Sequence, residues 1–156
     1  MPQPKAHHHV PVGLLWVESA PSGPPRLVQS KPRGAKAAGL RYERSVAKAI
    51  PGAVHGPWFR YADQTGSHWC QPDFYKLLPE AVLVLEAKLT WTPNGHQQIF
   101  QLYSPVLGKF FNRPVHGIVV CKNLTPETNL DWVCSDLTGA ITRSLAHLPT
   151  IWHYLA

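Results

Sequence analysis

Residues 71–88 read QPDFYKLLPEAVLVLEAK, and this stretch decides the expected fold. Two runs typical of β-strands, residues 72–78 and 81–89, are separated by a Pro-Glu pair that is typical of a turn. The stretch is therefore predicted to form a β-hairpin that closes near residues 78–81. Side chains alternate between the two faces of each strand, so the hairpin also predicts which of its residues meet.

Polar side chains with metal chemistry lie at one end of this hairpin. Glu86 and Lys88 share a face of the second strand, Ala87 points to the other face, and Asp73 reaches the same neighbourhood from the first strand. Two carboxylates with waters and a substrate phosphate are a usual Mg²⁺ environment. An ordinary hairpin with a Glu and a Lys on its wet face is the alternative. Against it, the apolar run 81–85 predicts a strand buried on both faces, where such groups need partners or a role.

The motif Pro72-Asp73 followed by Glu86-Ala87-Lys88 resembles the PD-(D/E)XK nuclease superfamily in residue types, order and spacing. The resemblance implies that Asp73, Glu86 and the main-chain carbonyl of Ala87 hold Mg²⁺, for which Mn²⁺ can substitute. It also implies that Lys88 places the attacking water and that the products carry 5′-phosphates. No small-molecule cofactor is expected.

The chain has 156 residues, enough for one domain with its own core, and we expect an extended, proline-rich basic arm at 1–33 before a nuclease domain at 34–156. Fifteen Lys and Arg against nine acids give a net charge of +6, which favours a polyanion as partner. Three cysteines without C-x-x-C spacing indicate a reducing compartment. No apolar run approaches the roughly 20 residues of a membrane span, so a cytoplasmic protein without membrane contact is expected.

The arm is expected to lend a short strand around residues 14–17 and to carry basic residues near its end, namely Arg26, Lys31 and Arg33. Its run His7-His8-His9 invites a metal interpretation. We expect a solvated histidine tract instead, because no second cluster of ligands lies nearby in the sequence.

Residues 36–50 are predicted to form a helix that Pro51-Gly52 ends. Glu43 is its only acid, and the segment 39–43 is similar to the G-x-x-x-E pattern of Holliday-junction resolvases, in which the acid belongs to the metal site. The alternative is an ion pair of Glu43 with Lys36 or Arg44 on the same helix. The cationic side chains expected to hold the DNA backbone are Arg41, Arg44 and Lys48.

A first strand is predicted within residues 54–63, followed by a loop over 62–68. In the resemblance this loop lies beside the metal. Its candidate phosphate contacts, which could equally be ordinary loop polar groups, are Arg60, Gln64, Ser67 and His68.

A helix divided or kinked by Pro105 is predicted over residues 96–112. Gln98, Gln101 and Tyr103 resemble the Q-x-x-x-Y helix motif of the RecB-type branch, with a tighter spacing from Gln101 to Tyr103. The amides are expected to contact substrate phosphate or to brace the lysine of the hairpin, while the apolar face packs on the sheet.

Further elements are predicted as a strand at 115–121, a helix at 126–137 capped by Thr125, and a helix at 140–156 interrupted by a proline. The resemblance covers about residues 36–122. The expected fold is α/β, with a restriction endonuclease-like αβββαβ core in which helices flank a mixed central sheet.

The sequence thus predicts a metal-dependent deoxyribonuclease, structure-selective in the manner of a junction resolvase and acting as a homodimer with two sites. Compact nucleases of this kind are often found on phage. Three alternatives stay open: a non-catalytic nucleic-acid-binding module on a nuclease fold, an RNA-directed enzyme and an end-processing exonuclease.

Overall fold

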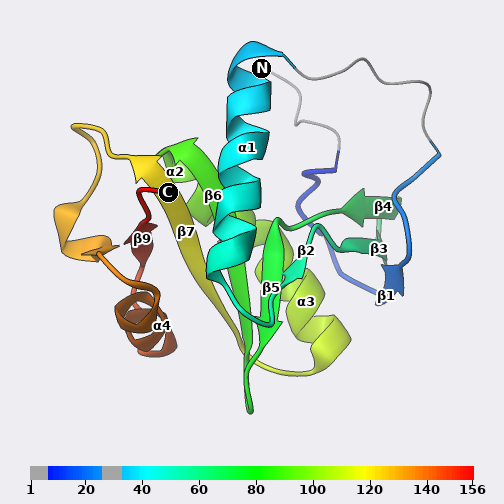
Figure 1. Ribbon diagram of the computed structural model, residues 1–156. Helices are drawn as coiled ribbons and strands as arrows, with labels where there is room; N and C mark the ends of the chain where they lie inside the picture. Colours follow the sequence, from blue (N-terminus) through cyan, green and yellow to red (C-terminus); the bar gives the residue numbers. More distant parts are fainter. Residues whose placement is uncertain (1–6, 26–32) are drawn as a thin grey trace.

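Residues 7–25 and 33–156 are described by a computed structural model (Figure 1). The elements in chain order are β1 (Trp16–Ala20), α1 (Gly34–Ala49), β2 (Val54–His55), β3 (Trp58–Asp63), β4 (Gly66–Cys70), β5 (Phe74–Leu77), β6 (Val82–Thr90), α2 (Pro93–Gln98), the π-helix η1 (Ile99–Tyr103), α3 (Ser104–Phe111), β7 (Val115–Asn123), the 3₁₀ turn η2 (Leu130–Trp132), β8 (Val133–Cys134), α4 (Leu137–Leu145) and β9 (Ile151–His153). The predicted basic residues Arg26 and Lys31 lie outside the described residues.

The predicted hairpin is confirmed as β5 and β6. The two strands are antiparallel, with Phe74 opposite Leu85 and Leu77 opposite Val82. The Leu78 amide donates to the Ala81 carbonyl at 2.9 Å, which closes the hairpin where the sequence predicts it.

The main sheet has the strand order β2-β5-β6-β7-β9-β8 and is mixed. Strand β5 runs antiparallel to both of its neighbours, β2 and β6, whereas β7 runs parallel to β6 and β9 runs parallel to both of its neighbours. Helix α1 crosses one face of this sheet, and α3 lies behind the opposite face (Figure 1). The prediction of an α/β fold with a mixed sheet flanked by helices is therefore confirmed.

Strand β6 separates two hydrophobic cores. Val82 and Val84 pack with the helices α2–η1–α3 and with the β3–β4 hairpin, whereas Leu83 and Leu85 pack with α1 and α4. All four side chains are fully buried. Continuous apolar sequence is what a strand covered on both faces requires, so the sequence predicts this central position correctly.

A second, three-stranded sheet has the order β1-β3-β4 and stands beside the main sheet (Figure 1). The predicted loop over 62–68 is wrong, because β3 and β4 form a hairpin whose turn is only Gln64-Thr65. The predicted short strand of the arm exists as β1, displaced to Trp16–Ala20. Residues of the arm therefore complete a sheet, and the strand predicted over 54–63 is divided between the two sheets.

The long helical region after β6 is continuous but not regular. Its middle turn is a π-helix in which the Ser104 amide bonds to the Ile99 carbonyl. Pro105 follows in the first turn of α3. Because proline has no N–H to continue the α-helical ladder, the wider turn accommodates it, so the predicted helix is irregular before Pro105 but not divided.

Of the two helices predicted beyond β7, the one over 126–137 is wrong and the one over 140–156 is correct only over its first residues. Thr125 does not cap a helix; its amide bonds to the Thr128 hydroxyl in a turn, and η2 and β8 follow. The tail contains α4 only to Leu145, after which the left-handed residue His147 and Pro149 redirect the chain into β9. The short apolar β9 is recognisable only through its pairing with β7 and β8, which local sequence does not record.

All three cysteines are free thiols. Cys70 on β4 and Cys121 on β7 are buried, whereas Cys134 on β8 is partly exposed. Burial raises the pKa of the Cys121 thiol to about 11. Burial, and then the charge of Glu86, also raises the pKa of the Cys70 thiol. In the part of the chain that is described, no helix has the length and apolarity needed to cross a bilayer.

Candidate active site

Two carboxylates face each other where β5 begins, beside the middle of β6. The Asp73 amide donates to Glu86 Oε1 at 2.8 Å, and the Ala87 amide donates to Asp73 Oδ2 at 2.8 Å. Each acid is thus held by the backbone of the other strand. The side chains meet because the β5–β6 register that pairs Phe74 with Leu85 continues to this pair.

Burial gives this pair unusual electrostatics. Glu86 is 3% exposed. Burial and then the charge of Glu43 raise the pKa of Asp73 to about 7, against opposing effects of the Ala87 amide, Lys88 and a hydrogen bond with Glu86. Burial and then Asp73 raise the pKa of Glu86 well above its usual range. The site therefore has more negative charge than its single lysine balances, and these carboxylates are groups that could hold a cation.

Glu43 reaches the site from α1. Its carboxylate accepts a hydrogen bond from His55 Nε2 at 2.9 Å, and the His55 ring stacks on Phe74 at 4.7 Å. The intrahelical ion pair considered from the sequence is replaced by this contact with β2. Glu43 is near enough to raise the pKa of Asp73 and Glu86, and in this arrangement it is engaged by a histidine.

Lys88, two residues after Glu86 on β6, lines a cavity of about 520 Å³. Helix α2 comes close to it because residue 95 is glycine: a Cβ there would lie 3.0 Å from Val119 Cγ2 and 3.7 Å from Lys88 Cε. Gln98 and Gln101 line the same cavity, as the helix motif predicts. His8 from the arm lines it too, a contact that no sequence pattern other than the histidine run indicates.

Gln98 has an unusual environment in this cavity. Its Nε2 lies 3.2 Å from His8 Nδ1, while its Oε1 is buried and has no hydrogen-bond partner among the described residues. A buried acceptor without a donor is unfavourable, by about 1–3 kcal/mol. An incoming group with an N–H or O–H would relieve it, so this amide is suited to contact a ligand.

Other predicted residues do not meet the carboxylates. Arg41, Arg44 and Lys48 are exposed along α1. Tyr103 is 1% exposed and its hydroxyl donates to the Gln71 carbonyl, so it supports the site from within the core and has no surface for substrate.

Arg60 and Ser67 lie on the outer face of the small sheet. The Arg60 guanidinium contacts Glu18 at 3.5 Å and lies 5.5 Å from the Trp16 ring. Their neighbours in the sequence, Tyr61 and His68, point the other way, toward the arm. The predicted group of loop residues is therefore divided between two faces.

The prediction of a solvated histidine tract is wrong for His9. Its Nε2 lies 2.8 Å from Asp63 Oδ2, and its ring stacks on His68 with 3.7 Å between centroids. Further potential metal ligands do lie beside His9 in the folded chain, but they are more than fifty residues away from it in the sequence. No local pattern could reveal it.

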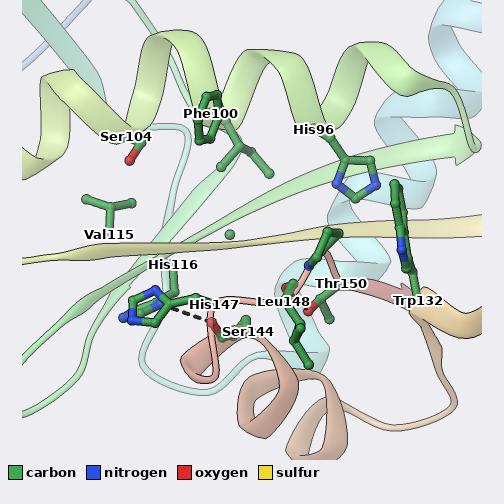
Figure 2. A pocket seen from close by; sticks show the side chains of 13 residues that line it. His96, Phe100, Ser104, Val115, His116, Trp132, Ser144, His147, Leu148 and Thr150 are labelled. Carbon is green, nitrogen blue, oxygen red and sulfur yellow. Dashed lines mark hydrogen bonds between the residues drawn. The ribbon is translucent and has the colours of Figure 1, made fainter.

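A second cavity, of about 420 Å³, lies between the α2–α3 region and the turn after α4 (Figure 2). Figure 2 shows His96 and Trp132 at one end and His116 with His147 at the other. Burial lowers the pKa of His96 to about 4, so its imidazole is neutral at pH 7. None of the residues lining this cavity is an acid, so it offers no carboxylate ligand for a metal.

Comparison with known proteins gives no independent assignment. No protein-family model, curated protein or solved structure matches this chain. The features of this chain that indicate a function are therefore the geometry of the carboxylate pair and the sequence motif that contains it.

Proposed function

We propose that this protein is a metal-dependent nuclease that hydrolyses phosphodiester bonds of DNA and leaves 5′-phosphates. The observation that carries the proposal is the reciprocal pair of half-buried Asp73 and buried Glu86, which is short of positive charge and adjacent to Lys88. Acids whose pKa values are raised by burial and by a neighbouring charge are characteristic of functional sites, and Lys88 beside them lines a cavity.

The order of elements around the pair supports the same proposal. The chain order is αβββαβ if the core is taken as helix α1, then strands β2, β5 and β6, then the α2–α3 region and strand β7. The β3–β4 hairpin is then an insertion between the first and second core strands. We propose that this is a restriction endonuclease-like core, with the carboxylates at the end of its central hairpin.

The proposed Mg²⁺ ligands are Asp73, Glu86 and the carbonyl of Ala87, with Glu43 nearby. The metal would supply an activated water and a counter-charge for the phosphate. The Lys88 ammonium then positions the nucleophile by its charge. Metal binding should displace the proton that the raised pKa values retain on the pair near neutral pH.

From the cavity wall, the Gln101 amide can donate to phosphate oxygens, and Gln98 Oε1 can accept a hydrogen bond from a bound water. Exposed Arg41, Arg44 and Lys48 supply positive charge for the DNA backbone, independent of base sequence. One site per chain implies that cutting both strands of a duplex needs two copies, and we propose a homodimer for that step.

The test is cleavage of supercoiled plasmid, a labelled four-way junction, a blunt DNA duplex and an RNA duplex, each with Mg²⁺, Mn²⁺ or EDTA. Lys88→Ala is compared with Lys109→Ala, which removes the same charge from the exposed side of α3. We expect Lys88→Ala to reduce cutting at least about a hundredfold, and Lys109→Ala to leave it unchanged. Absence of cutting by the natural chain with either metal would refute the proposal.

A non-catalytic nucleic-acid-binding role is the second candidate, and the small sheet favours it. Trp16 and Trp69 flank Arg60 on the outer face, with the guanidinium 5.5 and 5.9 Å from the two ring centroids. Aromatic rings and an arginine on one sheet face can stack single-stranded bases. Binding of a labelled oligonucleotide that survives Lys88→Ala and is lost in Trp69→Ala, without cleavage by any form, would support this role.

A further inference from the structure

A compact group of metal-binding side chains lies apart from the carboxylate pair, at the junction of the arm and the small sheet. The ligand atoms of His9, Asp63 and His68 all lie within 4.8 Å of one another. His9 Nε2 is 2.8 Å from Asp63 Oδ2, and His68 Nε2 is 3.3 Å from Asp63 Oδ1. Adjacent ligands of a tetrahedral zinc site are separated by about 3.4 Å, given zinc–nitrogen bonds of roughly 2.0–2.1 Å.

The carboxylate at the centre of the group is fixed and ionised. The Asp63 side chain has no exposed surface. It accepts hydrogen bonds from the Val12 amide at 2.8 Å, the Thr65 amide at 2.8 Å and the Thr65 hydroxyl at 2.6 Å. Burial opposes ionisation, but these bonds and that of His9 outweigh it and hold the pKa of Asp63 well below its usual range.

The histidines are also oriented by their surroundings. Their rings stack with an interplanar angle of 16°, and the Tyr61 hydroxyl donates to the His9 carbonyl. The Thr65 hydroxyl lies 2.8 Å from His68 Nε2 and 3.3 Å from His9 Nε2, so the polar atoms converge on one position. A metal would replace the Thr65 contacts at the two Nε2 atoms, while the ring stacking and the Tyr61 hydrogen bond keep the histidines in place.

We propose that His9, Asp63 and His68 bind a divalent ion of the zinc class, which fastens the arm to the β3–β4 hairpin. Two imidazoles and one carboxylate suit Zn²⁺ better than Mg²⁺, which takes oxygen ligands. The site is thus chemically distinct from the proposed nuclease centre. The fourth coordination position is available to water or to the Thr65 hydroxyl.

Such an ion would also fix one wall of the cavity that Lys88 lines. His8 precedes His9 and contacts Gln98 beside Lys88. Holding His9 on the small sheet therefore keeps His8 at this wall. The structural role requires no turnover at the carboxylates, so it stands whether or not the nuclease proposal does.

The experiment titrates Zn²⁺ against a chromogenic chelator, with saturating Mg²⁺ present, and records the visible spectrum with Co²⁺ as a substitute. We compare the natural chain with His68→Ala, with His9→Ala and with the double variant His7→Ala/His8→Ala. The natural chain and the double variant should each bind one equivalent of Zn²⁺, and the bound ion should raise their melting temperatures. With Co²⁺, both should show the absorption bands of a four-coordinate site. His68→Ala and His9→Ala should each weaken binding more than tenfold.

Circular dichroism and melting without metal verify that each variant is folded, and the His9 and His68 variants check one another because they lie on different segments. Binding lost in the double variant but kept in His68→Ala would show a histidine tract alone and overturn the proposal. Absence of binding by the natural chain would overturn it as well. Lys88→Ala, which tests the nuclease proposal, should bind Zn²⁺ as the natural chain does. Failure of the nuclease proposal is therefore distinguishable from failure of the zinc-site proposal.

Discussion

Replacing Asp73 with asparagine should stabilise the metal-free protein at alkaline pH, although it removes a proposed metal ligand. The carboxyl pKa is 3.8 in an exposed chain and about 7 in the folded protein. A folded-state pKa above the unfolded one means that the native protein binds more protons between these values, so the wild-type stability falls as pH rises through this interval. The full difference corresponds to roughly 4 kcal/mol above pH 7.

Asparagine keeps an oxygen that can accept from the Ala87 amide, now 2.8 Å from Asp73 Oδ2, but it carries no charge against Glu86 and Glu43. At pH 8 in EDTA, Asp73→Asn should therefore be more stable by up to about 4 kcal/mol, and near pH 4 the two proteins should be equal. Added Mg²⁺ should raise the stability of the wild type and leave that of the variant nearly unchanged.

Urea unfolding from pH 4 to 8.5 measures these differences, with the fluorescence of the six tryptophans as signal. Glu127→Gln is the matched control, because it removes one negative charge from an exposed turn. It should shift stability by less than about 0.5 kcal/mol at either pH. If Asp73→Asn were less stable than the wild type at pH 8 without metal, the argument from buried charge would be refuted.

Three other substitutions test the packing and the histidine chemistry. Gly95→Ala should cost roughly 1–3 kcal/mol and reduce cleavage, because its Cβ would meet Val119 Cγ2 at 3.0 Å and displace α2. Gly39→Ala in α1, where the Cβ meets nothing within 4 Å, should instead stabilise by roughly 0.5–1 kcal/mol, and thermal melts of both variants measure the contrast. His96→Gln should keep an acceptor for the Trp91 indole, now at 3.1 Å. Since the pKa of His96 falls from 6.5 to about 4, the wild type should lose roughly 3 kcal/mol as pH falls through this range, and the variant should lose much less in acid unfolding titrations.

The hairpin was predictable because its information is local. A proline-containing turn, two apolar runs and strict alternation determine that Asp73 and Glu86 meet, and the register agrees. Helix α1 was likewise found within two residues of each end, since Pro51-Gly52 stops it. Where one short segment contains both the pattern and its boundary, the sequence is sufficient.

The failures have a common physical origin in long-range pairing. Strand β9 has three residues and depends on neighbours that precede it by many residues, so its apolar side chains resemble a helical face. His9 contacts Asp63 because the pairing of β1 with β3 brings the arm beside the small sheet. Non-local hydrogen bonds decide both cases, and neither leaves a periodic signal in the sequence.

The three thiols give this protein a built-in measure of local opening. A maleimide should modify partly exposed Cys134 first, because Cys70 and Cys121 are buried and their raised pKa values leave little thiolate. Modification of the other two then waits for the strand that carries each of them to open. Cys70 lies in the small sheet and Cys121 in the main sheet, so their labelling rates report separately how often each sheet exposes its interior.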